Sequence, residues 1–178
     1  IRLSLVGSEM CIRDRMKQEH STYQSNLFTS QILFNAGYEQ RLSAWRNLRN
    51  SLSTDDSCIQ TVLDVYQHCP LTKTSTDYFK KDTWPSAWQL LEKNEYNLFD
   101  KCLAVMYTVN LTERFCKEKF SIIRAVTKEE SNNNHKFYYI ITVGKLFIDC
   151  QNKESFDEQT FDKKYIQQYN KIIRETDK

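Results

Sequence analysis

The hydrophobic pattern of the chain changes its period once, at about residue 119. Before that point apolar residues recur at three- and four-residue intervals, which is typical of helices that pack on one face. After it come two segments rich in β-branched and aromatic residues, 119–126 and 137–143, and Gly144-Lys145 offers a tight turn into a third segment, 146–149. This order predicts an α+β fold, with N-terminal helices packed on a small three-stranded antiparallel sheet.

The first part of the chain predicts two helices before Pro70. One covers residues 27–52 with a break near Gly37, and its apolar stripe is Tyr38, Leu42, Trp45, Leu48 and Leu52. The other follows a capping cluster at residues 54–57, and its inward residues are Ile59, Val62, Leu63 and Tyr66.

Three further segments have helical spacing. We expect a short helix to start at Trp84-Pro85 and end near Asn94, because proline suits a first helical position; its buried residues would be Trp84, Trp88 and Leu91. Residues 97–112 form the next helix, with a core-facing stripe of Leu98, Cys102, Val105, Met106 and Val109. The pattern at residues 156–176 predicts a C-terminal amphipathic helix that buries Tyr165, Tyr169, Ile172 and Ile173.

The composition argues against several functional classes. The net charge is only +2 over 178 residues, so no overall charge draws the chain to nucleic acid or to an anionic membrane. Arg41, Arg46 and Arg49 could make a local nucleic-acid contact, although a solvated helix face is the simpler interpretation. The apolar runs are strand-sized, which predicts no membrane span. The three glycines form no phosphate-binding loop, so we expect no nucleotide cofactor.

The cysteines and histidines predict neither disulfides nor a metal site. Apart from Cys11, the cysteines are Cys58, Cys69, Cys102, Cys116 and Cys150, an odd number with no CxxC pair. Such a set favours free thiols in a reducing cytoplasm. His20, His68 and His135 do not combine with cysteines at metal-binding spacing, so no metal or other cofactor is expected.

The first fifteen residues, IRLSLVGSEMCIRDR, resemble the translation of a sequencing adapter. We therefore expect residues 1–15 to be an artefact and Met16 to be the native start. Residues 16–26 are polar and are expected to form a flexible N-terminus. Residues 27–178 have a length that suits a single α+β domain.

One constellation could carry chemistry. The segment HKFYYIITVGKLFID, from His135 to Asp149, and the upstream WPSAWQLL segment resemble the transglutaminase-like branch of the papain-like cysteine enzymes. The resemblance spans about residues 82–150. It implies a catalytic triad of Cys102, His135 and Asp149, in which the cysteine attacks an amide carbonyl, the histidine transfers the proton and the aspartate orients the ring.

The position of Cys102 in the sequence argues against a catalytic role for this residue. A helix that starts near Asn97 places this cysteine in its second turn, where the helix dipole has little effect, and Leu98-Phe99 occupy the place of the family's nucleophile. The family's Gly-Asp-Cys signature is also missing. We therefore interpret Cys102 as an inert core thiol, His135 as a residue at a strand end and Asp149 as a turn cap.

A second resemblance concerns the segments DTWPSAWQLLE, residues 82–92, and AVMYTVNLTERF, residues 104–115. They look like parts of small uncharacterised proteins of marine tailed bacteriophages. This likeness implies a viral protein in the bacterial cytoplasm or associated with the virion. Our leading hypothesis is a non-enzymatic scaffold, with a degenerate cysteine-enzyme site, that binds a host or virion protein. The alternative is an active cysteine hydrolase or acyl-transferase acting on amide bonds.

Overall fold

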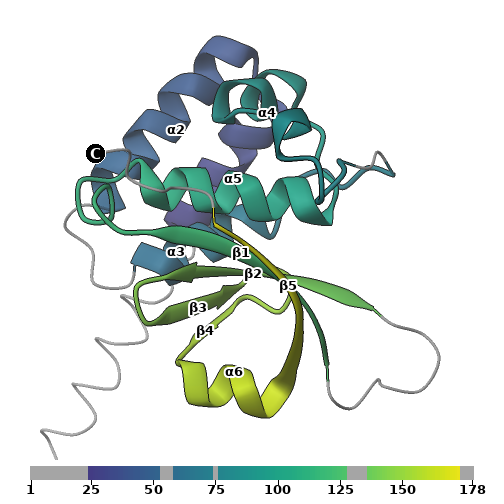
Figure 1. Cartoon of the computed structure of the whole chain (residues 1–178). Coiled ribbons are helices and arrows are strands. Elements are labelled where there is room, and N and C mark those ends of the chain that lie inside the picture. The colour runs from purple at the N-terminus through teal and green to yellow at the C-terminus, as the bar shows by residue number, and fades with distance from the viewer. Residues whose placement is uncertain (1–23, 53–57, 74–75, 128–135, 173–178) are drawn as a thin grey trace, which may run out of the picture.

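The computed structural model describes residues 24–52, 58–73, 76–127 and 136–172, and it has an α+β fold (Figure 1). A helical segment at residues 24–35 leads into the helices α2 (Tyr38–Leu52), α3 (Cys58–Tyr66), α4 (Ala87–Lys93) and α5 (Leu98–Asn110), with a short 3-10 turn at Lys81–Thr83. The strands and the last helix are β1 (Phe120–Thr127), β2 (Phe137–Val143), β3 (Leu146–Asp149), β4 (Glu154–Phe156), α6 (Glu158–Lys164) and β5 (Tyr165–Ile172). The predicted α+β class is confirmed, but the described sheet has five strands, not three.

The N-terminal prediction is confirmed in outline. The first helix breaks at residues 36–37, beside Gly37, and its stripe residues Trp45, Leu48 and Leu52 are buried. Residues 24–26, which were expected to belong to the flexible N-terminus, are already helical. Residues 1–15, Met16 and the capping cluster at 54–57 lie outside the described residues.

Helix α5 is the centre of the helical layer. It contacts α2, α3 and α4, and its other side lies on strand β2 (Figure 1). The buried hydroxyl of Thr108 joins α2 and α3 to α5. Its Oγ1 accepts a hydrogen bond from Trp45 Nε1 at 2.9 Å, lies 2.9 Å from the Tyr66 hydroxyl and donates to the Ala104 carbonyl at 2.8 Å. No helix in the described ranges combines the length and the apolar character needed to cross a membrane.

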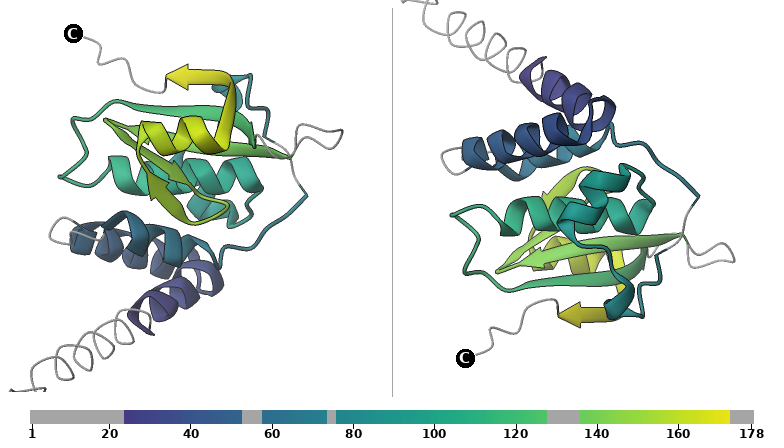
Figure 2. Two further views of the ribbon diagram at one scale, coloured as in Figure 1. Left: turned by 90° about the horizontal axis from the view of Figure 1, so that it is seen from below. Right: turned by 90° about the horizontal axis from the view of Figure 1, so that it is seen from above.

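The sheet has the strand order β4-β3-β2-β1-β5 and separates two apolar clusters. β1 and β2 pair antiparallel from Phe120↔Val143 to Val126↔Phe137, and β2 turns into β3 through Gly144, whose φ is +57°. Because side chains alternate along a strand, Ile122, Ile141 and Ile148 face the helical layer while Ile123, Tyr138 and Ile140 form a second cluster with Phe161 and Tyr165. Helix α6 covers this second face (Figure 2).

The predicted C-terminal helix at 156–176 is correct only for Glu158–Lys164 and wrong for Tyr165–Ile172, while residues 173–176, including the predicted buried Ile173, lie outside the described residues. The chain forms the short strand β4, then α6, and from Tyr165 to Ile172 it runs as strand β5 against β1. Tyrosines and isoleucines spaced by four residues also satisfy the two-residue period of a strand, so the spacing did not distinguish the two structures. Strand β5 pairs with the edge of β1 that would otherwise be open, with one shift of register between Arg124 and Ala125.

The predictions for the helix after Pro85 are only partly right. Ser86 is the N-cap of α4 and forms a capping box with Gln89, so the helix starts at Ala87 and the proline precedes it. The buried face is Ala87, Leu90 and Leu91. Trp88 is 51% exposed, because α4 packs through Ala87, Leu90 and Leu91, and Trp84 precedes the helix and forms no helical stripe with it. In α5, Leu98 is also exposed, as the first residue of the helix, while Cys102, Val105, Met106 and Val109 are buried as expected.

The arginines of α2 have structural contacts. Arg41 donates hydrogen bonds to the carbonyl oxygens of Ala36, Leu91 and Glu92, at 2.9, 2.9 and 3.0 Å. It therefore binds the last turn of α4 and the end of the preceding helical segment. Arg49 stacks over the Trp45 ring, 4.1 Å from its centroid. The interpretation of a merely solvated helix face is wrong for Arg41.

Candidate functional site

The start of α5 decides what Cys102 can do. Asn97 caps the helix: its Oδ1 accepts hydrogen bonds from the backbone N–H groups of Phe99 and Asp100, each at 2.8 Å. Asp100 completes a capping box by accepting from the Asn97 side chain and backbone through Oδ2. The N–H groups of Phe99 and Asp100 are thus bound to Asn97, and Cys102 lies beyond the first turn, where the dipole has little effect.

Cys102 is fully buried against the sheet. Its Sγ donates to the carbonyl oxygen of Tyr139 in β2 at 3.7 Å. Burial raises the pKa of the Cys102 thiol well above its ordinary value, and the neighbouring Cys150 thiol and the Asp149 carboxylate raise the pKa further, while Lys101 acts in the opposite direction. A thiol in this setting stays protonated at neutral pH, so it is a poor nucleophile.

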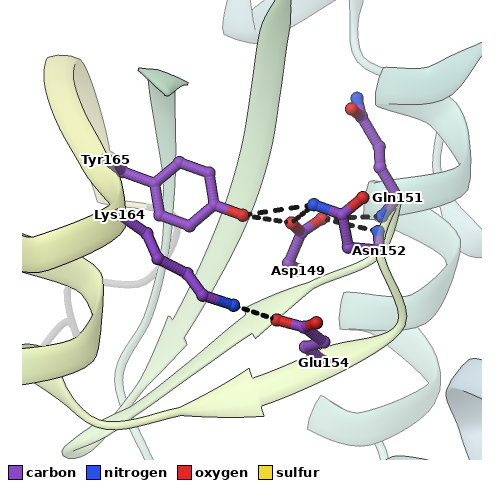
Figure 3. A network of polar contacts seen from close by, with 6 residues as sticks. All are labelled: Asp149, Gln151, Asn152, Glu154, Lys164 and Tyr165. Carbon is purple, nitrogen blue, oxygen red and sulfur yellow. Dashed lines mark hydrogen bonds and ion pairs between the residues drawn. The ribbon is translucent and has the colours of Figure 1, made fainter. Parts of the chain in front are cut away.

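Asp149 is the centre of a hydrogen-bonded turn between β3 and β4 (Figure 3). Its Oδ1 accepts from the backbone N–H groups of Gln151 and Asn152, at 2.8 and 3.1 Å. Its Oδ2 accepts from the Tyr165 hydroxyl at 2.6 Å and from Asn152 Nδ2 at 2.8 Å. Four donors match the roughly four acceptor positions of a carboxylate, so an imidazole N–H would have to displace one of them.

The sheet separates the thiol from this carboxylate. Ile148 and Cys150 belong to the cluster on the helical face, together with Cys102, whereas Tyr165, the partner of Asp149, belongs to the cluster under α6. The alternation of side chains along β3 therefore directs Asp149 away from Cys102. His135, the third predicted residue of the triad, lies outside the described residues.

A pocket of about 340 Å³ lies on the helical side of the molecule, between the loop that precedes α4, α4 itself and the start of α5. Trp84, Pro85 and Leu90 form its apolar lining. Its size falls at the lower end of the range for small-ligand pockets, about 300–1,000 Å³.

Charged groups of mostly one sign line this pocket. The carboxylates of Asp82, Glu95 and Asp100 line it, and Lys93 is its one cationic residue among the described residues. Asp82 and Glu95 are exposed, whereas Asp100 is buried, with 5% of its surface exposed.

Asp100 has an unused hydrogen-bond acceptor. Oδ2 serves the capping box, but the buried Oδ1 has no hydrogen-bond partner, a condition that costs a buried polar atom about 1–3 kcal/mol. Burial raises the pKa of this carboxyl, while Thr76, the Asn97 backbone N–H and Lys93 lower it. Thr76 approaches the carboxyl without closing a hydrogen bond to Oδ1.

No motif of the sequence marks this pocket. The helical spacing predicts that Trp84 belongs to the core, yet the residue is half-buried and lines the pocket. Asp100 carries a recognisable signal, since an acidic residue three positions after an asparagine cap is typical of a capping box. That signal predicts a helix start, but it does not predict that the second carboxylate oxygen has no hydrogen-bond partner or that the residue lines a pocket.

Comparisons of the chain with models of protein families and with curated protein sequences give no match.

Proposed function

We propose that this protein is a non-enzymatic scaffold that binds another protein, with a transglutaminase-like arrangement that lacks a working nucleophile. The single observation that carries the proposal is the position of Cys102: its thiol is buried under the sheet, on the face opposite to Asp149. A cysteine hydrolase needs a thiolate that meets its substrate, and neither condition fits this setting.

The role of Asp149 supports the same conclusion. The carboxylate binds two backbone N–H groups of its own turn and two side chains, which is the work of a residue that holds β3, β4 and β5 together. In keeping with the phage resemblance, we propose a viral origin, a location in the bacterial cytoplasm or on the virion, and a host or virion protein as partner.

Alkylation of the native protein tests this proposal. We expect iodoacetamide to modify the exposed Cys116 at pH 8 and to leave Cys102 unmodified at both pH 6 and pH 8, with the sites mapped by mass spectrometry. Cys116 serves as the internal control for an ordinary accessible thiol. Faster modification of Cys102 than of Cys116 at pH 6 would identify an activated nucleophile, and would favour the amide-cleaving or acyl-transferring enzyme instead.

A further inference from the structure

We propose that the pocket between α4 and α5 binds an organic cation, a guanidinium or primary ammonium group. This inference rests on the proposed function, because it names the chemistry by which the scaffold would recognise a basic side chain of its partner.

The first support is the state of Asp100. This residue is more than nine-tenths buried, it lines the pocket, and its Oδ1 has no hydrogen-bond partner. Buried carboxylate oxygens normally accept a hydrogen bond, so a ligand that donates one to this oxygen would be stabilised. Guanidinium and ammonium groups are hydrogen-bond donors and not acceptors. Oδ2 stays bound to Asn97, so the cap of α5 holds the carboxyl in place for a ligand.

The second support is the lining around Asp100. Asp82 and Glu95 add carboxylates at the exposed part of the pocket, and Trp84 adds an aromatic surface, the two partners that recognise organic cations. An anion fits poorly, because Asn97 already accepts from the N–H groups of Phe99 and Asp100 at the start of α5. A metal ion fits poorly as well: within the described ranges, no three carboxylates, thiols or imidazoles lie close enough together to hold one.

Lys93 and Glu95 allow a test in which one substitution strengthens binding of the cation and the other weakens it. Lys93 is exposed, lines the same pocket and carries the same charge as the ligand, so it should weaken binding. We expect Lys93→Gln to strengthen binding about two- to fivefold and Glu95→Gln to weaken it by a similar factor. Both side chains are exposed, so neither change should disturb the fold.

The experiment is an NMR titration of the full chain with Nα-acetyl-arginine methylamide, followed at the indole N–H of Trp84. The matched ligand is Nα-acetyl-citrulline methylamide, which has nearly the same shape and no charge. We expect saturable shifts with the arginine compound and none with the citrulline compound. Equal responses to both ligands, or no saturable response to arginine, would overturn the proposal.

Asp100→Asn is the central variant. The asparagine retains an oxygen for the Asn97 cap but replaces the unused oxygen by an NH₂ group, so we expect affinity for the arginine compound to fall about tenfold or more. Glu158→Gln, on α6 across the sheet, is the control for loss of one negative charge and should leave binding unchanged. An unchanged affinity in folded Asp100→Asn would overturn the proposal. If this variant does not fold, the opposite effects of Lys93→Gln and Glu95→Gln decide, and equal affinities in those two variants would overturn it.

Two further comparisons distinguish a protein ligand from a small molecule, and failure of the cation site from failure of the proposed function. A tetrapeptide with one central arginine that binds more tightly than the arginine compound indicates a protein ligand, and equal affinities indicate a small molecule; both results support the shared chemistry. Among the described residues no cysteine lines the pocket, so alkylation of Cys102 and binding of arginine are independent readouts. A reactive Cys102 would refute the inert scaffold without affecting the proposed cation site. Absence of arginine binding would refute the cation site without affecting the conclusion that Cys102 is inert.

Discussion

Replacing Tyr165 by phenylalanine removes one hydroxyl from the network around Asp149, and we expect the free energy of unfolding to fall by about 1.5–3 kcal/mol. The hydroxyl donates to Asp149 Oδ2 at 2.6 Å, the acceptor residue is fully buried, and Tyr165 itself is 3% exposed (Figure 3). The range is that of a hydrogen bond to a charged group. The expected loss is smaller than the cost of leaving a buried charge without any partner, because Gln151 and Asn152 still donate hydrogen bonds to the carboxylate.

Urea denaturation followed by circular dichroism measures this loss, and thermal unfolding should show a fall of about 2–4 °C for each kcal/mol. Tyr138→Phe is the matched control. Tyr138 lies in the same cluster, with its ring centroid 5.5 Å from that of Tyr165, and its hydroxyl makes no hydrogen bond within the described residues. We expect this control to change stability by less than about 0.5 kcal/mol. Equal losses for the two variants, or a loss below about 0.5 kcal/mol for Tyr165→Phe, would refute the structural role of Asp149.

Three other perturbations follow from the fold. Gly144→Ala should lower the free energy of unfolding by about 1 kcal/mol because φ is +57°. Gly37→Ala should lower it little, because no described atom beyond its chain neighbours lies within 4 Å of the added Cβ; urea denaturation compares the two variants. Arg41→Met should lower stability by about 1.5–3 kcal/mol through loss of three carbonyl contacts, and the exposed Arg46→Met should not. Burial raises the pKa of Asp100 above 3.8, so the folded state holds this proton more tightly than the unfolded chain; its contribution to stability should decline as pH rises from about 3.8 through the raised pKa. Asp100→Asn should remove that decline in a pH series of unfolding free energies.

The β-hairpin and the burial of Cys102 could be predicted from the sequence because one local signal sufficed for each. The segments 137–143 and 146–149 are rich in β-branched and aromatic residues around a Gly-Lys turn, and the hairpin forms there. The stripe that contains Cys102 has the period of a helix packed on one face, and the thiol is buried.

Strand β5 and the pocket depend on contacts between distant parts of the chain. The spacing of Tyr165, Tyr169 and Ile172 is compatible with a helix, and only the open edge of β1 favours a strand. The pocket combines residues from Thr76 to Asp100 around a helix start, so no single motif marks it. Trp84 and Trp88 have the spacing of a buried helical pair, but the helix begins at Ala87, so Trp84 lies outside it.

The most direct test of the inert site is the urea dependence of Cys102 alkylation. A thiol buried under the sheet reacts only when the protein opens, so the logarithm of the rate should rise with urea below the unfolding midpoint, with a slope near that of global unfolding. Cys116, which is exposed, should react at a rate nearly independent of urea over the same range. A Cys102 rate that is fast without urea and flat across this range would contradict the account, because it would mean that the thiol is already exposed in the native fold.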